Sequence, residues 1–146
     1  MQIRIFVAGK PSLAYAKSGV AEYLKRLTRY GRYELIHLKA GDSESVSSAL
    51  LERSEGSYRI ALDERGDNLD THAWAARFEA LELRGDLKTV SFLIGASDGH
   101  TEALRDSADE IWCLSKLTLQ HELALVVLLE QLYRVATFRR GEPYHR

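Results

Sequence analysis

The feature that most constrains the fold is a regular alternation of strand-like and helix-like segments along the whole chain. Short runs rich in Ile, Val, Leu and aromatic residues are followed by longer segments whose apolar residues recur at helical spacing. This alternation predicts an α/β fold, a mostly parallel sheet with helices on both faces. No linker or repeat interrupts it, so residues 1–146 are expected to form one domain. The expected strands are 2–8, 32–39, 58–63, 89–94 and 111–114, and the expected helices are 13–29, 43–54, 70–83, a short one ending near 108, and 121–138.

Polar residues mark several expected boundaries. Ser12 and Asp70 each precede a helical pattern and are expected to act as N-caps. The segment Glu64 to Asn68 is polar and contains a glycine, so it is expected to be a loop after the third strand.

The last expected helix is apolar all round over Leu123 to Leu129. One face would cover the sheet, and another needs a second partner because an apolar helix is unstable on an open surface. A homodimer contact would supply that partner, and the alternative is a helix sandwiched within the monomer.

Charge is unevenly distributed, although the net charge is only −1. Residues 1–40 carry eight basic residues (Lys or Arg) and two acidic residues (Asp or Glu). Residues 41–110 carry seven basic and sixteen acidic residues, and residues 111–146 carry five basic and three acidic residues. If the two basic ends meet in the fold, they would form a surface suited to phosphates. Uneven scatter without function is the alternative.

Several protein classes are disfavoured by the sequence. Cys113 is the only cysteine, so an intrachain disulfide and a cysteine-based zinc site are excluded, and in its apolar strand it is expected to be an inert core residue. His121-Glu122 lacks the second histidine of a zinc-protease motif, so no metal is expected. The apolar run at Leu123 to Leu129 is far shorter than the roughly 20 residues of a membrane span, and no secretory signal is recognisable, so a cytoplasmic location is expected.

The turn Gly95 to Gly99 lies between a buried strand and a helix. Glycines there would let backbone amides face a ligand at the carboxyl edge of the sheet. The same residues fit the G-x-S-x-G pattern of serine hydrolases, with Ser97 as the nucleophile. Asp106 or Asp109, followed by His121 or His145, would then complete a catalytic triad in the order Ser, Asp, His. A tight turn without chemistry is the third possibility.

Two further segments carry polar chemistry. Ser115 to His121 links the last strand to the last helix and would lie at the same sheet edge as Gly95 to Gly99, so the two loops could enclose a small ligand. The tail Arg139 to Arg146 holds three arginines, a tyrosine and a histidine, which suit phosphate binding, base stacking or proton transfer. A frayed, solvated tail is the alternative.

Several segments, in the same order along the chain, resemble the motifs of one protein family. They include Phe92-Leu93-Ile94-Gly95 with Gly99, the segment Leu114 to Leu119 before His121, Glu130 to Arg134, and the terminal Pro143-Tyr144-His145-Arg146. In these the chain is similar to the ribosomal large-subunit pseudouridine N3-methyltransferase H family, within the SPOUT superfamily. The resemblance implies a C-terminal trefoil knot, a homodimer, S-adenosylmethionine as cofactor, and a pseudouridine in 23S rRNA of the assembled ribosome as acceptor.

The resemblance also implies roles for individual residues. A second subunit is expected to complete each site. Residues implied in substrate binding and chemistry are His121, Tyr144, His145 and Arg146. Residues implied in cofactor binding are Leu62, Gly95, Ala96, Ser115, Lys116, Leu117, Thr118, Leu119 and Gln120.

Three positions depart from the family pattern: Ala96 replaces a usual glycine, Gln120 a usual proline, and Leu125 a common arginine. The methyl group of Ala96 would crowd the cofactor if its backbone needed positive φ. The alternative function is therefore a ribosome-binding or RNA-binding descendant without catalysis.

Overall fold

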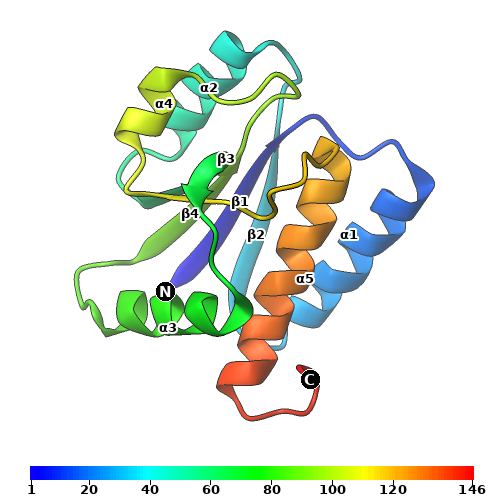
Figure 1. Ribbon diagram of the computed structural model, residues 1–146, viewed down its shortest axis with the longest axis vertical. Helices are drawn as coiled ribbons and strands as arrows, with labels where there is room; N and C mark the ends of the chain where they lie inside the picture. Colours follow the sequence, from blue (N-terminus) through cyan, green and yellow to red (C-terminus); the bar gives the residue numbers. More distant parts are fainter.

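Five parallel strands form a single sheet in the computed structural model, which describes residues 1–146 (Figure 1). The strand order is β2-β1-β4-β3-β5, and every neighbouring pair is parallel. The predicted α/β fold class is confirmed. The strands are β1 (Gln2–Ala8), β2 (Arg32–Leu38), β3 (Tyr58–Asp67), β4 (Thr89–Ile94) and β5 (Glu110–Trp112).

The helices cover both faces of the sheet, as predicted. Helices α1 (Ala14–Leu27), α3 (Thr71–Leu83) and α5 (His121–Arg139) share a hydrophobic cluster with one face. The opposite face packs against α2 (Ser43–Arg53) and α4 (Glu102–Ser107). Alternate residues of β1 supply both cores, because Ile5 faces the larger cluster and Phe6 the smaller one.

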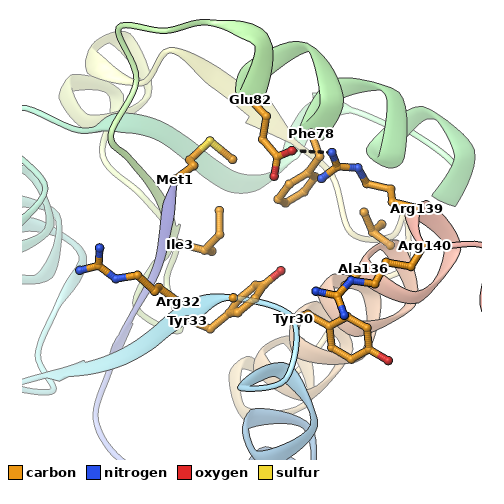
Figure 2. A pocket seen from close by; sticks show the side chains of 12 residues that line it. Met1, Ile3, Tyr30, Arg32, Tyr33, Phe78, Glu82, Ala136, Arg139 and Arg140 are labelled. Atoms are coloured by element: carbon orange, nitrogen blue, oxygen red, sulfur yellow. Dashed lines mark hydrogen bonds and ion pairs between the residues drawn. The ribbon is translucent and has the colours of Figure 1, made fainter.

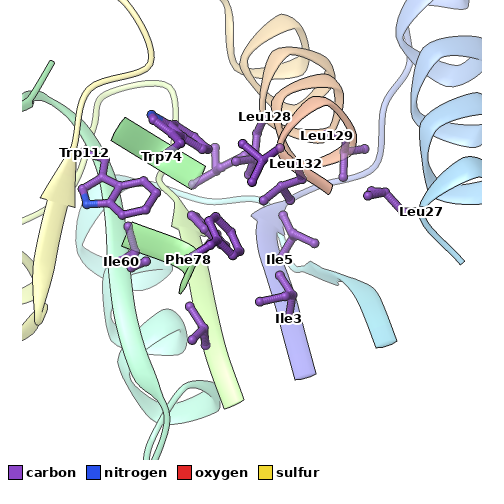
Figure 3. Close-up of a cluster of buried hydrophobic side chains, with 14 of the residues drawn as sticks. Ile3, Ile5, Leu27, Ile60, Trp74, Phe78, Trp112, Leu128, Leu129 and Leu132 are labelled. Atoms are coloured by element: carbon purple, nitrogen blue, oxygen red, sulfur yellow. The ribbon is translucent and has the colours of Figure 1, made fainter. Parts of the chain in front are cut away.

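The larger core is aromatic on the α3 side and aliphatic on the α5 side (Figure 3). The rings of Trp74 and Trp112 lie 4.8 Å apart between centroids, and Phe92 stacks against Phe78 at 6.0 Å. Trp112 is fully buried although β5 has only three residues, so this one side chain anchors the edge strand.

The start of α1 differs from the prediction. Ser12 does not cap this helix: the N-cap residue is Leu13, which supplies no side-chain cap. The carboxylate of Glu122, on α5, accepts hydrogen bonds from the backbone N–H groups of Ser12 and Leu13 instead. Asp70 does cap α3, accepting from the backbone N–H of Ala73 at 2.8 Å, as predicted.

The segment after Asp63 is the second correction. Residues 64–67 were expected to lie in a loop, but β3 continues through them to Asp67. Trp112 of β5 pairs first with Leu62 and then, across an irregularity, with Asp67. A Cβ at Gly66 would lie 2.5 Å from the carbonyl carbon of Ile111, so only glycine allows this close crossing. The C-terminal trefoil knot stays a prediction.

Helix α5 presents three faces. Leu125, Leu128 and Leu132 are buried in the larger core. Val126 packs against α1: a Cβ added to Gly19 would lie 3.1 Å from Cγ1 of Val126. Leu123 and Val127, one turn apart, remain partly exposed. None of the helices has the length and apolarity needed to cross a membrane.

Candidate functional site

A cleft of about 580 Å³ lies at the carboxyl edge of the sheet. Its walls are the end of β3, the turn after β4, and the loop that leads into α5, so both predicted loops meet there. Eight of the nine predicted cofactor residues line it; the exception is Lys116, which is exposed outside. The lining residues are Leu62–Arg65, Ile94–His100, Leu114, Ser115, Leu117–His121 and Ala124.

The turn after β4 is closed by its own backbone. The N–H of Gly99 donates to the carbonyl of Ala96 at 2.8 Å, and Gly99 has a φ of 89°, which favours glycine. Ala96 does not have positive φ, because all positive-φ residues in the chain are glycines. Its methyl group therefore causes no backbone strain at this position.

Gly95 makes a close approach to His100. A Cβ on Gly95 would lie 2.9 Å from Nδ1 of His100 and 3.2 Å from the backbone carbon of Gly99. Because the ring occupies the space where a side chain would point, the turn keeps its shape only with glycine at position 95.

His100 is a cleft residue that the sequence analysis did not identify. Only 6% of it is exposed, and its Nε2 lies 3.1 Å from the carbonyl oxygen of Leu93. Nδ1 is buried without a hydrogen-bond partner. Burial lowers the pKa of the imidazole, which outweighs the opposing effect of the Leu93 carbonyl, so the ring is neutral at physiological pH. Nothing in the sequence marks the histidine that follows this G-x-x-x-G turn as a buried residue of the cleft.

Carboxylates lie along the β3 side of the cleft, and these too were missed. The Asp63 side chain is 6% exposed and pairs with Arg65 at 3.2 Å and with Arg105 at 3.8 Å. Glu64 accepts a hydrogen bond from the hydroxyl of Thr118 at 3.1 Å, which joins β3 to the loop before α5. These contacts exist because β3 continues past Asp63 instead of ending there.

Gln120 both lines the cleft and begins α5. Its side-chain oxygen accepts from the backbone N–H of Glu122 at 3.0 Å and of Leu123 at 3.1 Å. A proline here could not make these bonds, so the departure from the family pattern supplies a helix cap. His121, the first helical residue, is thereby held at the rim of the cleft.

The tail folds back against the C-terminal half of α5. Tyr144 donates its hydroxyl to Glu130 at 3.2 Å, its ring packs edge-on against Tyr133, and the guanidinium of Arg134 lies 4.7 Å above it. His145 Nδ1 lies 3.3 Å from Arg134, and Arg146 is exposed. Burial, Tyr23 and Glu130 raise the pKa of Tyr144, so it stays protonated in this position.

The four residues implied in chemistry are therefore not assembled within one chain. His121 is the first residue of α5, whereas Tyr144 and His145 fold back against Glu130 and Arg134. Glu130 and Arg134 lie about 14 Å and about 20 Å further along the helix axis, at about 1.5 Å per residue.

The structure does not support the serine-hydrolase interpretation or a contact between position 125 and the cleft. Ser97 is exposed and makes no side-chain hydrogen bond, so a nucleophile–histidine pair for a hydrolase is absent. Leu125 is fully buried in the core, so a residue at this position does not face the cleft. No cluster of three or more metal-ligating side chains is present.

Sequence and structure comparisons agree with one another. A family model described as "Predicted SPOUT methyltransferase" matches residues 1–145. The ribosomal RNA large subunit methyltransferase H of one Thermus thermophilus strain is 47% identical over 146 residues, covering 100% of this chain and 99% of that protein. The protein of the same name from Deinococcus radiodurans is 42% identical with the same coverage.

Two solved structures share the fold at low sequence identity. A probable methyltransferase from Bordetella pertussis Tohama I has a TM-score of 0.61 at 14% identity, over 92% of this chain and 94% of that one. A tRNA (m1G37) methyltransferase from Aquifex aeolicus has a TM-score of 0.58 at 13% identity, over 100% and 75% of the two chains.

Proposed function

Because the chain belongs to the SPOUT methyltransferase family, we propose that it transfers the methyl group of S-adenosylmethionine to N3 of a pseudouridine in large-subunit ribosomal RNA. The observation that carries the proposal is the cleft at the carboxyl edge of the sheet, where the Gly95 turn and the loop before α5 face each other with His121 at the rim. Relatives named as ribosomal RNA large subunit methyltransferases match the chain from end to end.

The cleft fits S-adenosylmethionine in size and chemistry. Its 580 Å³ lies within the range of about 300–1,000 Å³ typical of small-molecule sites. The compact turn at Gly95 and Ala96 leaves room beside the backbone, and Leu62, Leu117 and Leu119 supply apolar surface. Glu64, which forms no ion pair, adds negative charge beside a ligand that carries a positive sulfonium. Ser115, Thr118 and Gln120 would provide the remaining polar contacts.

The bound cofactor supplies an electrophilic methyl group on a sulfonium, and no metal is required. The task of the protein is to align the acceptor nitrogen with that methyl group and to remove the imide proton from N3. His121, which lies at the rim of the cleft, would accept that proton. The guanidinium of Arg146 would stabilise the resulting anionic base, and Tyr144 or His145 would orient it.

A homodimer resolves the separation between His121 and the tail. The partner's tail would reach the cleft that the chain's own tail does not approach. The partly exposed Leu123 and Val127 on α5, and Leu117 with 75% exposure beside the cleft, form apolar surface near that cleft. In this arrangement each site takes His121 from one subunit and Tyr144, His145 and Arg146 from the other.

A subunit-mixing experiment tests the shared site. His121→Ala and a chain lacking residues 142–146 are each expected to be inactive. After random mixing, about half of the dimers contain one of each, and one of their two sites is complete. Methyl transfer should therefore recover to about a quarter of the wild-type rate. If native mass spectrometry shows heterodimers and activity stays absent, the tail does not act across the interface.

A further inference from the structure

A second cavity lies at the opposite edge of the sheet, beside the start of β1 (Figure 2). Its volume is about 260 Å³, and it is bordered by α3, the end of α5 and the segment that leads into β2. Neither the Gly95 turn nor the loop before α5 contributes to it, so it is separate from the methyl-transfer cleft. The lining residues are Met1, Ile3, Tyr30–Tyr33, Phe78, Glu82, Val135, Ala136, Arg139 and Arg140.

Arginines dominate the polar surface of this cavity. Arg139 pairs with Glu82 at 2.6 Å, whereas Arg32 and Arg140 have no carboxylate within 4.0 Å. Arg140 lies 4.6 Å above the ring of Tyr30, and Arg32 extends outward from the rim in Figure 2. The uncompensated guanidinium groups of Arg140, at the cavity, and Arg32, beyond its rim, make this edge of the sheet positive, which favours an anionic ligand.

Two tyrosines complete the lining. The hydroxyl of Tyr33 points into the cavity in Figure 2 and has no protein hydrogen-bond partner. Burial raises the pKa of Tyr33, so the group remains an O–H donor. The hydroxyl of Tyr30 donates to Glu142 at 2.6 Å, and this bond raises the Tyr30 pKa to about 12. The cavity is thus joined to the tail that follows α5.

The size of the cavity selects the kind of ligand. At 260 Å³ it is smaller than the sites of about 300–1,000 Å³ that enclose whole small molecules. The cavity is therefore better suited to one monomer unit of a polymer than to a whole small molecule. Arginine planes, tyrosine rings and a free hydroxyl donor are the groups that bind the phosphates and bases of single-stranded nucleic acid.

We propose that this cavity binds one nucleotide of a ribosomal RNA strand, other than the nucleotide that is methylated. The inference rests on the proposed function, because that function brings RNA to the protein. The cavity and His121 lie at opposite ends of α5, about 27 Å apart along the helix, so one chain cannot place the same nucleotide in both. Arg32, from the basic first 40 residues, and Arg139 and Arg140, from the basic C-terminal segment, line this one cavity.

Binding to purified ribosomes that lack the modification tests the inference. Arg32→Ala and Arg140→Ala are each expected to weaken binding about tenfold. Each should also lower the slope of log affinity against log salt by about one, as expected when a phosphate contact is lost. Arg53→Ala, an exposed arginine on α2 away from both cavities, is the matched control and should change affinity less than twofold.

Calorimetric titration with S-adenosylmethionine separates this inference from the proposed function. The two variants should bind the cofactor like the wild type. If they also bind ribosomes like the wild type, while the wild type methylates them, the cavity is not an RNA site although the function stands. A wild-type protein that neither binds nor methylates ribosomes overturns both.

Site-specific crosslinking identifies the ribosomal component at the cavity. A photoreactive benzoylphenylalanine at position 32 should form an adduct that ribonuclease removes. An adduct with a ribosomal protein instead would contradict the RNA assignment.

Discussion

The carboxylate of Glu122, in the first turn of α5, accepts a hydrogen bond from the backbone N–H of Leu13 at 3.2 Å, so one helix caps the start of another. Glu122 is only 6% exposed and also binds the N–H of Ser12. It is adjacent to His121, so the contact fixes the beginning of α5 where the helix borders the cleft.

Glu122→Gln should lower the melting temperature at neutral pH by several degrees. Burial opposes ionisation of Glu122, but the N–H groups of Leu13 and Ser12 outweigh it and lower the pKa below the ordinary 4.5. A lowered pKa means that the ionised group stabilises the fold at neutral pH, and that this stability is lost as the pH falls through the lowered value.

The difference between the wild type and Glu122→Gln should therefore shrink as thermal unfolding is followed below pH 4.5. Glu52→Gln, an exposed glutamate on α2, is the control. A gap that stays constant across the acid range would show that Glu122 does not act through its charge.

Gly95→Ala should weaken binding of S-adenosylmethionine at least tenfold and lower stability by about 1–3 kcal/mol, the usual cost of overpacking. The added methyl group would collide with the His100 ring at 2.9 Å. The double variant Gly95→Ala, His100→Ala should lose less than the sum of the single variants, because the shorter side chain removes the collision.

Calorimetric titration and thermal unfolding of the four proteins of this cycle measure the coupling. Strictly additive losses would mean that the backbone of Gly99, and not His100, is what excludes a side chain at position 95.

Ala96→Gly should change cofactor affinity and methyl transfer less than twofold. Ala96 already has an ordinary backbone conformation, so glycine relieves no strain there. Steady-state kinetics with ribosomes as substrate provide the measurement. A large gain in rate would show that the Ala96 methyl group obstructs the site.

Deletion of residues 142–146 should abolish methyl transfer and leave S-adenosylmethionine binding intact. The melting temperature should fall by only a few degrees, since the tail is largely exposed. It contributes the Tyr144–Glu130 and Tyr30–Glu142 hydrogen bonds and the surface ring contacts of Tyr144 and His145. Unfolding scans with and without cofactor measure both effects. A collapse of stability would assign the tail a structural role instead.

Periodicity predicted the strands and helices because each carries a continuous apolar pattern that packs against one layer. It could not predict that Glu122 would replace Ser12 as a cap, since that contact joins residues about 110 positions apart. The polar continuation of β3 was missed for a related reason. Asp63 to Asp67 has no apolar alternation, and only the close crossing of Gly66 over β5 makes it a strand.

The candidate site was predictable where local sequence specifies local geometry. The Gly95 turn and the Ser115 to Gln120 loop follow β4 and β5, two parallel strands on either side of β3 that end at the same edge of the sheet, so their meeting there could be expected. The position of the tail was not, because Tyr144 is held by Glu130, Tyr133 and Arg134 through contacts that no period encodes. His100 was missed because its burial depends on the fold of the turn around it.

The most direct test of the central claim is transfer of a labelled methyl group from S-adenosylmethionine to purified ribosomes that lack the modification, with the product nucleotide mapped by mass spectrometry. We predict label on N3 of one pseudouridine in large-subunit RNA, lost in the His121→Ala variant. Label on a different nucleotide would contradict the proposed acceptor. Ribosome binding without any transfer would show that the chain is a non-catalytic member of its family.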